Sequence, residues 1–576
     1  MKRLPLGLVA LVLVAHVLPA QGGQYLGPGF HPAPVPPPGG RGRPNRPAGQ
    51  NVLTAAKVDP IRWESWWGYN REDLLPARGL PEDALLGTAD SGLGRAQTPA
   101  ETRARVMPVF RAALEDRSSD VRGAACIAIG RNGDAKDVPL LVAHLTDRDR
   151  RVVECAILGL GLLRQADADA ALLKALGQEG RTSKERSLAL LALGLSGGET
   201  VRPLMTDGLA AGLAEDRRMA TRATHTDACR AIAAGLWSGG DLGVTDRAPA
   251  VADALRAAHA AIPASDEVLR AHILLGMAKL RDGSTRGFLA ALLKDPIAGV
   301  RRSAAVALGR AAPGDDVVTA DLLVTAAARE PDAEARHAMT IALGRLASRE
   351  GNGADKSFAA LLKEAQEQDR QHRAFALIGL GLSRRKEASA PLKAAFEEAK
   401  DEVVRGAAAT ALGIANDTSA WPLIKERLAK RGNPTLTCHL LNYIVLTRHP
   451  EGLGIAATLL KESKDPDVVS AAALTLGIGG YSEAGGSLVG LISKTSVPEI
   501  RGACAAAAGR LGDRRMVEPL ITALDEVKGR EETKASLVAA LGLLVGRQPI
   551  LGMTRAIIDA DPGTRIEALD LILDLL

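Results

Sequence analysis

Large side chains are scarce in this chain of 576 residues. Aromatic residues make up only 3% of it, although hydrophobic residues reach 46% and Gly occupies 60 positions. Conventional domains build their cores from bulky aliphatic and aromatic side chains, so we do not expect such domains here. A repetitive array of small helical units fits this composition better.

Net charge is also missing from the main part of the chain. The formal charge of +5 is accounted for by five basic residues near the N-terminus, Lys2, Arg3, Arg41, Arg43 and Arg46. Residues 51–576 are therefore neutral overall. Nucleic-acid-binding domains are usually basic, so we expect no nucleic-acid partner.

The signatures of common catalytic and metal sites are absent as well. The five cysteines form no Cys-x-x-Cys pair, and each falls in an Ala-rich stretch where we expect a small buried side chain. Gly194–Gly198 matches the Gly-x-Ser-x-Gly pattern but has no strand before it. His272, His337, His372 and His439 occur at different offsets in the repeats described below, so we expect isolated histidines. The sequence predicts no catalytic residue, no cofactor and no metal.

One apolar run stands near the start of the sequence. After a basic beginning, residues Leu4 to Leu18 are mostly apolar and lead to Pro19-Ala20, which predicts a signal peptide over residues 1–20. Residues 21–50 contain eight Pro, eight Gly and no acidic residue, which predicts a disordered tether. No later segment predicts a membrane span in the mature chain. We therefore expect export to the periplasm, the cell surface or the medium.

A ten-residue phrase recurs along the rest of the chain. The clearest copies begin at Val121, Val152, Glu185, Val300, Ala335, His372, Val404, Val468, Ile500 and Thr533. Weaker copies begin at Thr226, Glu267, Leu436 and Thr564, which brings the number to fourteen. Successive copies start 31 to 41 residues apart. A period in this range predicts a solenoid of stacked units.

Each unit is predicted to be a pair of helices. Ala and Leu dominate the phrase, and the Gly that closes it is expected to stop the helix. An acidic residue often precedes or opens the phrase, as at Asp120, Asp467 and Glu499, where it is expected to cap free backbone N–H groups. A second helical phrase lies upstream with Pro in its first turn, a position that tolerates Pro. Examples are Pro139-Leu140, Pro203-Leu204 and Pro422-Leu423.

Together the Pro-Leu phrase and the Asp-Val-Arg-x-x-Ala-x-x-Ala-Leu-Gly-like phrase resemble the HEAT-repeat family, including its short bacterial form. The resemblance implies an all-α fold, a right-handed superhelix of about fourteen stacked hairpins, and it implies no particular activity. The expected organisation is a signal peptide at 1–20, a tether at 21–50, an N-terminal segment at 51–100 and the solenoid at 101–576.

The second position of the phrase is often basic, and stacking places equivalent residues in a row. Such a row serves either as a structural ladder that bonds acidic groups and carbonyls of the next repeat or as a contact for an acidic partner. The candidate residues are Arg122, Arg301, Arg336, Arg373, Arg405 and Arg501.

Three of the five tryptophans lie within five residues. In a helix, Trp63, Trp66, Trp67 and Asn70 share one face. We expect them to form an N-terminal cap over the first repeat; the alternative is an exposed platform for sugars or peptides. The phrase resembles a Trp-x-x-Trp-Trp-x-x-Asn segment near the start of exported HEAT-repeat proteins of planctomycete-type bacteria.

Two irregularities mark candidate contact surfaces. The intervals Ser196–Thr226 and Ser238–Asp266 are longer than the others, so they predict either binding loops or longer helices. The chain ends in an apolar helix over Leu569–Leu576, which self-association or a partner could cover.

The leading hypothesis is an exported, non-catalytic scaffold that binds a protein partner through its superhelical surface. A second hypothesis is an enzyme subunit, similar to HEAT-like bilin lyases or to DNA glycosylases built from such repeats, although export argues against their cytoplasmic substrates. A third is a cell-surface polysaccharide binder that uses Trp63, Trp66 and Trp67.

Overall fold

The computed structural model describes residues 59, 61–75, 97–209, 223–238, 246–430, 433–527, 529–545, 551–560 and 566–575. The predicted signal peptide and tether lie outside the described residues. Over the ranges given, all regular elements are helices. None of these helices combines the length and the apolar character needed to cross a membrane. The predicted all-α solenoid is confirmed.

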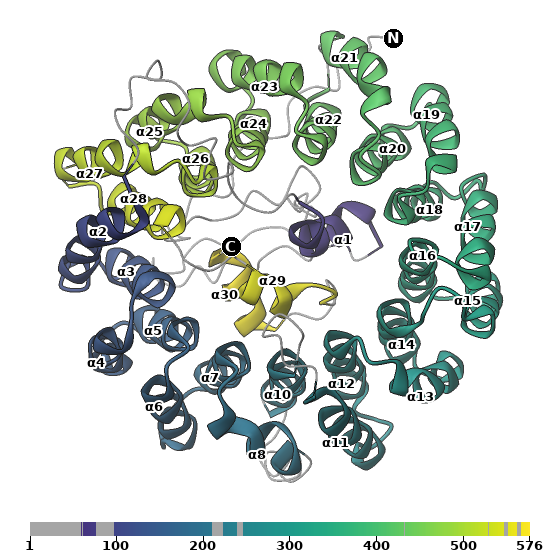
Figure 1. Cartoon of the computed structure of the whole chain (residues 1–576), viewed down its shortest axis with the longest axis horizontal. Coiled ribbons are helices and arrows are strands. Elements are labelled where there is room, and N and C mark those ends of the chain that lie inside the picture. Colours follow the sequence, from purple (N-terminus) through teal and green to yellow (C-terminus); the bar gives the residue numbers. More distant parts are fainter. Residues whose placement is uncertain are drawn as a thin grey trace, which may run out of the picture.

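In the described part of the chain, thirteen helical hairpins form two concentric layers (Figure 1). The inner layer consists of α3 (Ser119–Asn132), α5 (Arg150–Leu163), α7 (Ser183–Ser196), α10 (Ala223–Trp237), α12 (Glu267–Leu280), α14 (Ala298–Ala311), α16 (Ala333–Ala347), α18 (Arg370–Ser383), α20 (Glu402–Ile414), α22 (Pro434–Thr447), α24 (Pro466–Gly479), α26 (Pro498–Leu511) and α28 (Glu531–Val545). The outer layer consists of α2 (Pro99–Ala113), α4 (Val138–Ala143), α6 (Ala166–Gly177), α8 (Arg202–Met205), α11 (Ala248–Ala261), α13 (Arg286–Ala291), α15 (Val317–Arg329), α17 (Asn352–Glu364), α19 (Ser389–Glu398), α21 (Trp421–Ala429), α23 (Pro450–Glu462), α25 (Gly485–Lys494) and α27 (Val517–Glu526).

Short 3-10 helices extend many of the outer helices. They are η4 (Ala135–Asp137), η5 (His144–Thr146), η6 (Glu199–Val201), η8 (Gly283–Thr285), η9 (Leu292–Lys294), η10 (Lys386–Ala388), η11 (Thr418–Ala420), η12 (Ser482–Ala484) and η13 (Arg514–Met516). Proline is the second residue of α4, α8 and α21, as predicted for Pro139, Pro203 and Pro422.

The array closes into a ring, which the sequence did not predict. The last inner helix, α28, packs along the first one, α3, in the same way as each inner helix packs on its neighbour (Figure 1). Asn132 on α3 donates a hydrogen bond from Nδ2 to the carbonyl oxygen of Gly542 on α28, at 3.0 Å. Arg105 on α2 forms an ion pair with Glu518 on α27, at 2.9 Å. The described repeats therefore leave no open solenoid end to cap.

The Gly that closes twelve of the fourteen copies of the phrase lies within the helix and does not stop it. Gly130 is followed by two further residues of α3, and a Cβ built on it would lie 2.6 Å from the Cα of Gly159 on α5. Gly344 on α16 stands in the same relation to Gly379 on α18, at 2.7 Å. These glycines let neighbouring inner helices touch backbone to backbone, which a side chain would prevent.

The caps of the inner helices lie a residue or two before the positions expected. Asp120, Asp467 and Glu499 all fall inside the first turn of their helices. In α24 the capping residue is Asp465, whose side chain accepts hydrogen bonds from the backbone N–H groups of Asp467 and Val468. Asp149, Asp266, Asp332, Asp369 and Asp401 cap other inner helices in a similar way.

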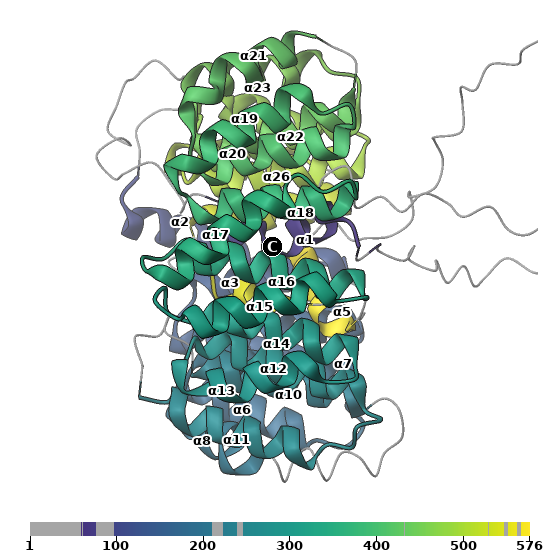
Figure 2. The same ribbon diagram turned by 90° about the vertical axis from the view of Figure 1, so that its right-hand side faces the viewer.

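Both ends of the described chain lie inside the ring, where they form a central body that we call the hub. The hub consists of α1 (Trp63–Asn70), η1 (Arg71–Asp73), α29 (Leu551–Ile557), residues 558–560 and α30 (Glu567–Leu575). Figure 2 shows the ring from the side, with α1 within its depth. The fourteenth copy of the phrase, at Thr564, therefore does not join the stacked array; it leads into α30.

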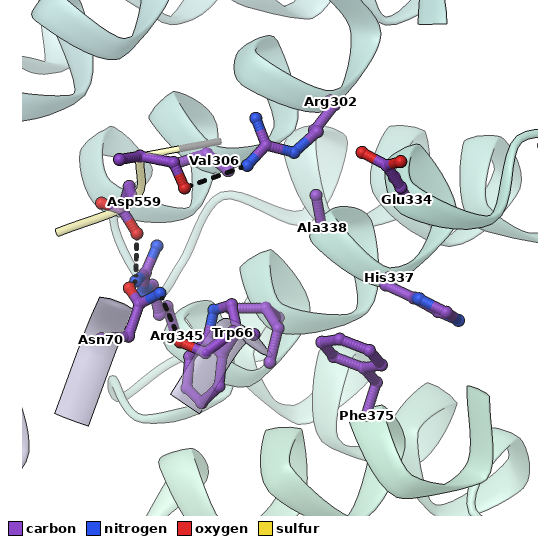
Figure 3. A pocket seen from close by; sticks show the side chains of 12 residues that line it. Trp66, Asn70, Arg302, Val306, Glu334, His337, Ala338, Arg345, Phe375 and Asp559 are labelled. Carbon is purple, nitrogen blue, oxygen red and sulfur yellow. Dashed lines mark hydrogen bonds and ion pairs between the residues drawn. The ribbon is translucent and has the colours of Figure 1, made fainter. Parts of the chain in front are cut away.

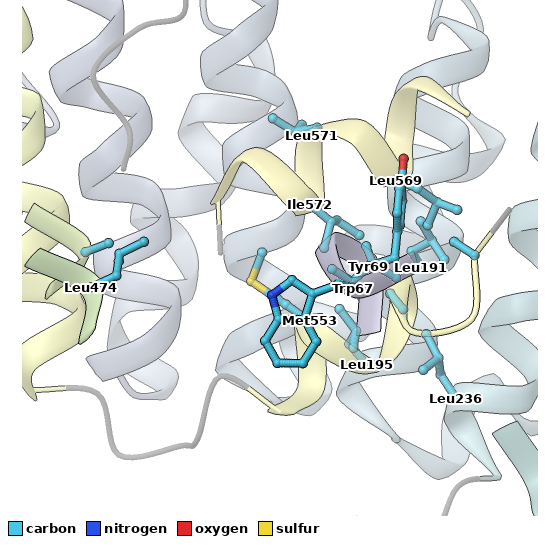
Figure 4. Packing of buried hydrophobic residues seen from close by; sticks show 14 of the residues in the cluster. Trp67, Tyr69, Leu191, Leu195, Leu236, Leu474, Met553, Leu569, Leu571 and Ile572 are labelled. Carbon is cyan, nitrogen blue, oxygen red and sulfur yellow. The ribbon is translucent and has the colours of Figure 1, made fainter. Parts of the chain in front are cut away.

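The hub packs against the inner wall through apolar side chains. In Figure 4, Met553 of α29 and Leu569 and Ile572 of α30 lie beside Leu195 of α7 and Leu236 of α10. All five side chains are buried. The apolar C-terminal segment is thus covered by the ring of its own chain, which removes the reason to invoke self-association through its described residues.

Candidate functional site

The hub meets a basic inner wall. In four repeats the residue directly after the phrase-closing Gly is Arg: Arg131, Arg310, Arg345 and Arg510. Each of these side chains bonds to the hub, whereas the equivalent residues Leu195 and Leu236 make apolar contacts with it. The Gly-Arg dipeptide was the signal in the sequence for this surface, and sequence reasoning missed it.

Asp559 anchors the C-terminal part of the hub. Its carboxylate accepts a hydrogen bond from Arg310 Nε at 2.9 Å and another from Arg345 Nη2 at 2.6 Å. Burial alone would raise the pKa of Asp559, but the charges of Arg310, Arg345 and Lys279 outweigh it and hold the pKa well below its usual range. Lys279 Nζ also donates to the carbonyl oxygen of Ile558. Burial lowers the pKa of this lysine to about 7.

The N-terminal part of the hub is held by two further acidic residues. Arg510 on α26 donates from Nη1 to both carboxylate oxygens of Glu72, at 3.0 Å, and both side chains are buried. Arg310 Nη1 donates to Asp73 Oδ2 at 3.0 Å. Asn70 Oδ1 accepts a bond from Arg345 at 3.3 Å. The inner wall therefore supplies cations, and the hub supplies the anions that neutralise them.

The three tryptophans lie at the centre of the ring and not over the first repeat. The backbone N–H of Trp63 donates to Gln371 Oε1 on α18 at 3.3 Å, and its ring lies 4.8 Å from that of His439 on α22. Trp63 is 0% exposed and Trp67 is 3% exposed, whereas Trp66 is partly buried. The side chains cover apolar surface, as a cap would, but in the middle of the array: Trp63 contacts α18 and α22, and Trp66 lines a recess with residues of α14, α16 and α18. An exposed platform of three tryptophans is not what the structure shows.

A recess lies between the hub and the inner wall (Figure 3). It holds about 470 Å³ of empty space, part of it open solvent. Trp66 and Phe375 form its aromatic side, and its polar side includes Arg302, Arg345 and Asp559. Its lining therefore combines aromatic walls with a few converging polar groups.

A pair of histidines lies at the edge of the recess, and His337 is one of its lining residues. His337 stacks on Phe375, with ring centroids 4.2 Å apart, and on His372 at 5.8 Å. The sequence predicted isolated histidines, but neighbouring helices α16 and α18 bring these two together despite their different offsets. Burial lowers the pKa of His337 to about 3. Its ring is therefore neutral at neutral pH.

Glu364, at the end of α17, lies behind these histidines. Its Oε2 accepts a hydrogen bond from Thr340 Oγ1 at 2.9 Å and lies 3.6 Å from His372 Nε2. Burial raises the pKa of Glu364 to about 7. Across the described part of the chain, no group of three or more His, Cys, Asp and Glu side chains is placed to hold a metal ion.

The predicted arginine row divides into two groups. Arg122 forms two hydrogen bonds with Asp147 of the next repeat, at 2.8 and 2.9 Å, and Arg301 pairs with Glu330 in the same way. Arg501 pairs with Glu532 at 2.7 Å. Arg405 donates hydrogen bonds to the carbonyl oxygens of Phe396 and Ala399. These four arginines are therefore bonded within the protein itself. For Arg336 and Arg373 the described residues show no such ion pair.

The row contains one residue that sequence reasoning missed and continues across the ring closure. Arg270 pairs with Asp295 at 2.8 Å and stands four residues after the capping residue Asp266, the same distance as Arg336 from Asp332. Arg270 lies closer along the chain to the phrase-closing Gly of its repeat than the other members of the row do. Aligning the repeats on that Gly therefore did not place Arg270 in the row. At the closure, Lys534 Nζ lies 3.5 Å from Asp116 Oδ2.

The longer intervals occupy the sector of the ring around α8 and α11 (Figure 1). Residues 210–222 and 239–245 of these intervals lie outside the described residues. The described helix of the second interval, α11, has 14 residues, against 6 for α13 and 10 for α19, so a longer helix accounts for part of the extra length of this interval.

Comparisons with known proteins agree with this architecture. The family model for HEAT repeats matches residues 82–156, 106–190, 249–344 and 358–437. A search of curated proteins finds no match. None of these findings bears on the resemblance of the Trp63–Asn70 phrase to planctomycete-type proteins.

Solved structures of similar fold are distant. The complex of CpcE and CpcF of phycocyanin lyase from Nostoc sp. contains a chain that is 20% identical, with 42% of this chain and 95% of that chain covered and a TM-score of 0.29. Human deoxyhypusine hydroxylase is 15% identical over 55% of this chain and 96% of that chain, with a TM-score of 0.21. A mutant of Kap121p is 12% identical over 76% of this chain and 53% of that chain, with a TM-score of 0.34.

At these identities and TM-scores the solved structures do not bear on the classification. The repeated hairpins, their two-layer stacking and the four matches of the family model establish the classification: the chain belongs to the HEAT-repeat family.

Proposed function

We propose that this protein is an exported, non-catalytic scaffold that binds a protein partner. The observation that supports the proposal is the closed two-layer ring with a filled centre. Such a body is a rigid frame, and most charged groups of its inner wall and arginine row are already bonded to the chain itself. The recess is lined by paired charges and a neutral His337, which favours binding over covalent chemistry.

The concave surface is not open, because the hub occupies it. A partner therefore meets the outer helices or the rims first. The sector of α8 and α11, where the intervals are longest, offers exposed polar groups: the side chain of Glu199 is 59% exposed and that of Asp253 is 73% exposed. Insertions in solenoids are often placed on the binding face.

The experiment that tests the proposal is affinity capture of the protein from the envelope and medium of its host. Three baits are compared: the unaltered protein, Ala257→Arg/Ala260→Arg on α11, and Thr325→Arg/Ala328→Arg on α15. All four positions are exposed on outer helices, so each pair adds the same charge and bulk to a similar surface.

We expect one protein partner to be recovered with the unaltered bait and the α15 variant but not with the α11 variant. Equal recovery with all three baits would exclude this sector. Recovery of glycans or small molecules alone would contradict the scaffold hypothesis and favour the polysaccharide alternative.

Export is tested separately on the same material. Cleavage near Ala20, measured by the intact mass of the protein recovered from the envelope or medium, is the expected result. A full-length protein confined to the cytoplasm would contradict export and would reopen the enzyme-subunit alternative.

A further inference from the structure

We propose that the inner wall around Trp63–Asp73 is a docking site for a segment of a protein partner. Residues Trp63–Asp73 of this chain occupy the site and compete with the partner's segment for it. The partner segment is a short helix with two or three aromatic residues, followed within about one turn by two carboxylates. This inference rests on the proposed function and specifies the chemistry of the partner.

Charge complementarity is the first argument. Glu72 and Asp73 are held by Arg510 and Arg310, which come from α26 and α14, and Asn70 is held by Arg345 of α16. Two adjacent inner helices, α14 and α16, and the distant α26 thus converge on one short segment. A buried ion pair roughly balances its own desolvation, so these contacts select an acidic segment and fix its register more than they add affinity.

Aromatic burial is the second argument. Trp63, Trp67 and Tyr69 are 0%, 3% and 8% exposed, although they belong to a helix of only eight residues. A helix of this length is not stable by itself, so its order comes from the wall against which it packs. Folding on a surface through a few aromatic anchors is how short ligand segments bind to protein grooves.

The recess beside Trp66 is the third argument, because α1 does not fill the site. Arg345 Nη1 and His337 Nδ1 are buried there and have no hydrogen-bond partner among the described residues. An acceptor group on an incoming segment would satisfy Arg345, and a larger side chain would fill the space beside Trp66 and Phe375. An external segment can therefore gain contacts that α1 does not make.

The test uses the full chain and a fluorescent peptide of residues 59–75. In the unaltered protein the internal segment competes at an effective concentration of about 1 mM, so the peptide binds with an apparent Kd near that value. In the Trp63→Ala/Trp67→Ala chain the internal competitor is weakened. If the peptide has an intrinsic Kd of about 10 μM, its affinity for this variant rises roughly 100-fold.

Two controls define the site. Adding Arg510→Glu to the Trp63→Ala/Trp67→Ala chain is expected to weaken peptide binding at least tenfold. A poly-glutamate peptide of the same length should not bind. Equal binding of poly-glutamate would show a general polyanion site and overturn the proposal, as would no binding of the 59–75 peptide at 100 μM to a variant that keeps the ring dimensions in solution scattering.

Hydrogen exchange on the unaltered protein covers the case in which the variant does not fold. The amides of α1 are expected to exchange through a local opening that is at least tenfold more frequent than the opening that exposes α18. Equal protection of both helices would mean that the segment never leaves the ring separately, and the proposal would be overturned. Neither the peptide binding nor the hydrogen exchange needs the host partner. Failure of this inference is therefore distinguishable from failure of the capture experiment.

Discussion

Gly542 on the last inner helix lies against Ala128 on the first, so closely that a Cβ built on Gly542 would be 2.7 Å from the Cβ of Ala128. Gly309 meets Ala342 at nearly the same distance inside the array. The ion pair between Lys534 and Asp116 joins the same two repeat positions as the ion pair between Arg122 and Asp147. The closure is therefore an ordinary joint between repeats.

Gly542→Val should open this joint. The added side chain would overlap α3, and overpacking of this kind costs about 1–3 kcal/mol. The chain does not run directly from α28 to α3 through an outer helix, so nothing covalent holds this joint together. We therefore expect a larger radius of gyration in solution scattering with unchanged helical circular dichroism. Gly309→Val should lower stability similarly but leave the ring closed, since α14 and α16 are connected through α15. An unchanged radius and stability for Gly542→Val would contradict the closure.

Trp63→Ala should destabilise the protein more than Trp66→Ala. Trp63 is completely buried against His439, and removing a buried Trp costs about 3–5 kcal/mol unless the segment detaches, which limits the loss to about 3 kcal/mol. Trp66 faces the recess, so its loss should cost less than half as much. Denaturant unfolding measures both. The reverse order, or two small effects with loss of sugar binding, would favour the aromatic platform.

The repeat architecture could be predicted because each unit carries its own signal. Closure could not, because it depends on small rotations summed over thirteen hairpins. The phrase-closing Gly was assigned to a helix stop because a stop and a close backbone approach both favour Gly; only the position of Gly159 beside Gly130 distinguishes them.

The site was harder to predict than the fold for a related reason. The partners of Arg310 and Arg345, Asp73 and Asp559, lie more than two hundred residues away, and no periodicity links them. The aromatic character of Trp63 and Trp67 predicted that both side chains are buried. It did not predict the helices against which they pack.

Asp559→Asn should lower stability by about 3–5 kcal/mol, because it leaves buried Arg345 without a carboxylate and buried Arg310 with only that of Asp73. Asp355→Asn is the matched control: Asp355 pairs with Arg385 on the surface, and its loss should cost less than about 1 kcal/mol.

The same pair of variants gives a dependence on pH. The pKa of Asp559 is lowered on folding, so its contribution is complete above the unfolded value of about 4 and is lost as the pH falls below that value. Urea unfolding between pH 3 and 7 should show a steeper loss of stability below pH 4 for the unaltered protein than for Asp559→Asn. Parallel curves would contradict the proposed role of this carboxylate.

Arg122→Ala and Arg336→Ala should separate the two groups of the arginine row. Arg122 is buried and bonded twice to Asp147, so its removal should cost about 2–4 kcal/mol. Arg336, for which no ion pair is seen among the described residues, should cost less than about 1 kcal/mol. Loss of partner capture with a folded Arg336→Ala protein would assign that position to the partner contact.

Glu364→Gln should remove a dependence of stability on pH near neutrality. Burial raises the pKa of Glu364 to about 7 from an unfolded value of about 4.3, so the folded state binds more protons between these values and stability falls as the pH rises through them. We expect the unaltered protein to lose about 2–4 kcal/mol from pH 4.5 to 7.5 through this group. Glu398→Gln on exposed α19 should keep that slope; Glu364→Gln should flatten it.

Closure of the ring changes how the protein can come apart. In an open solenoid a terminal repeat has one neighbour, so the array frays from its ends one unit at a time. Here α3 and α28 are neighbours, and the hub ties both ends of the described chain to the middle of the array. Melting the first repeat therefore breaks two joints at once. A chain assembled from weak, similar units thereby gains the all-or-none unfolding of a compact domain.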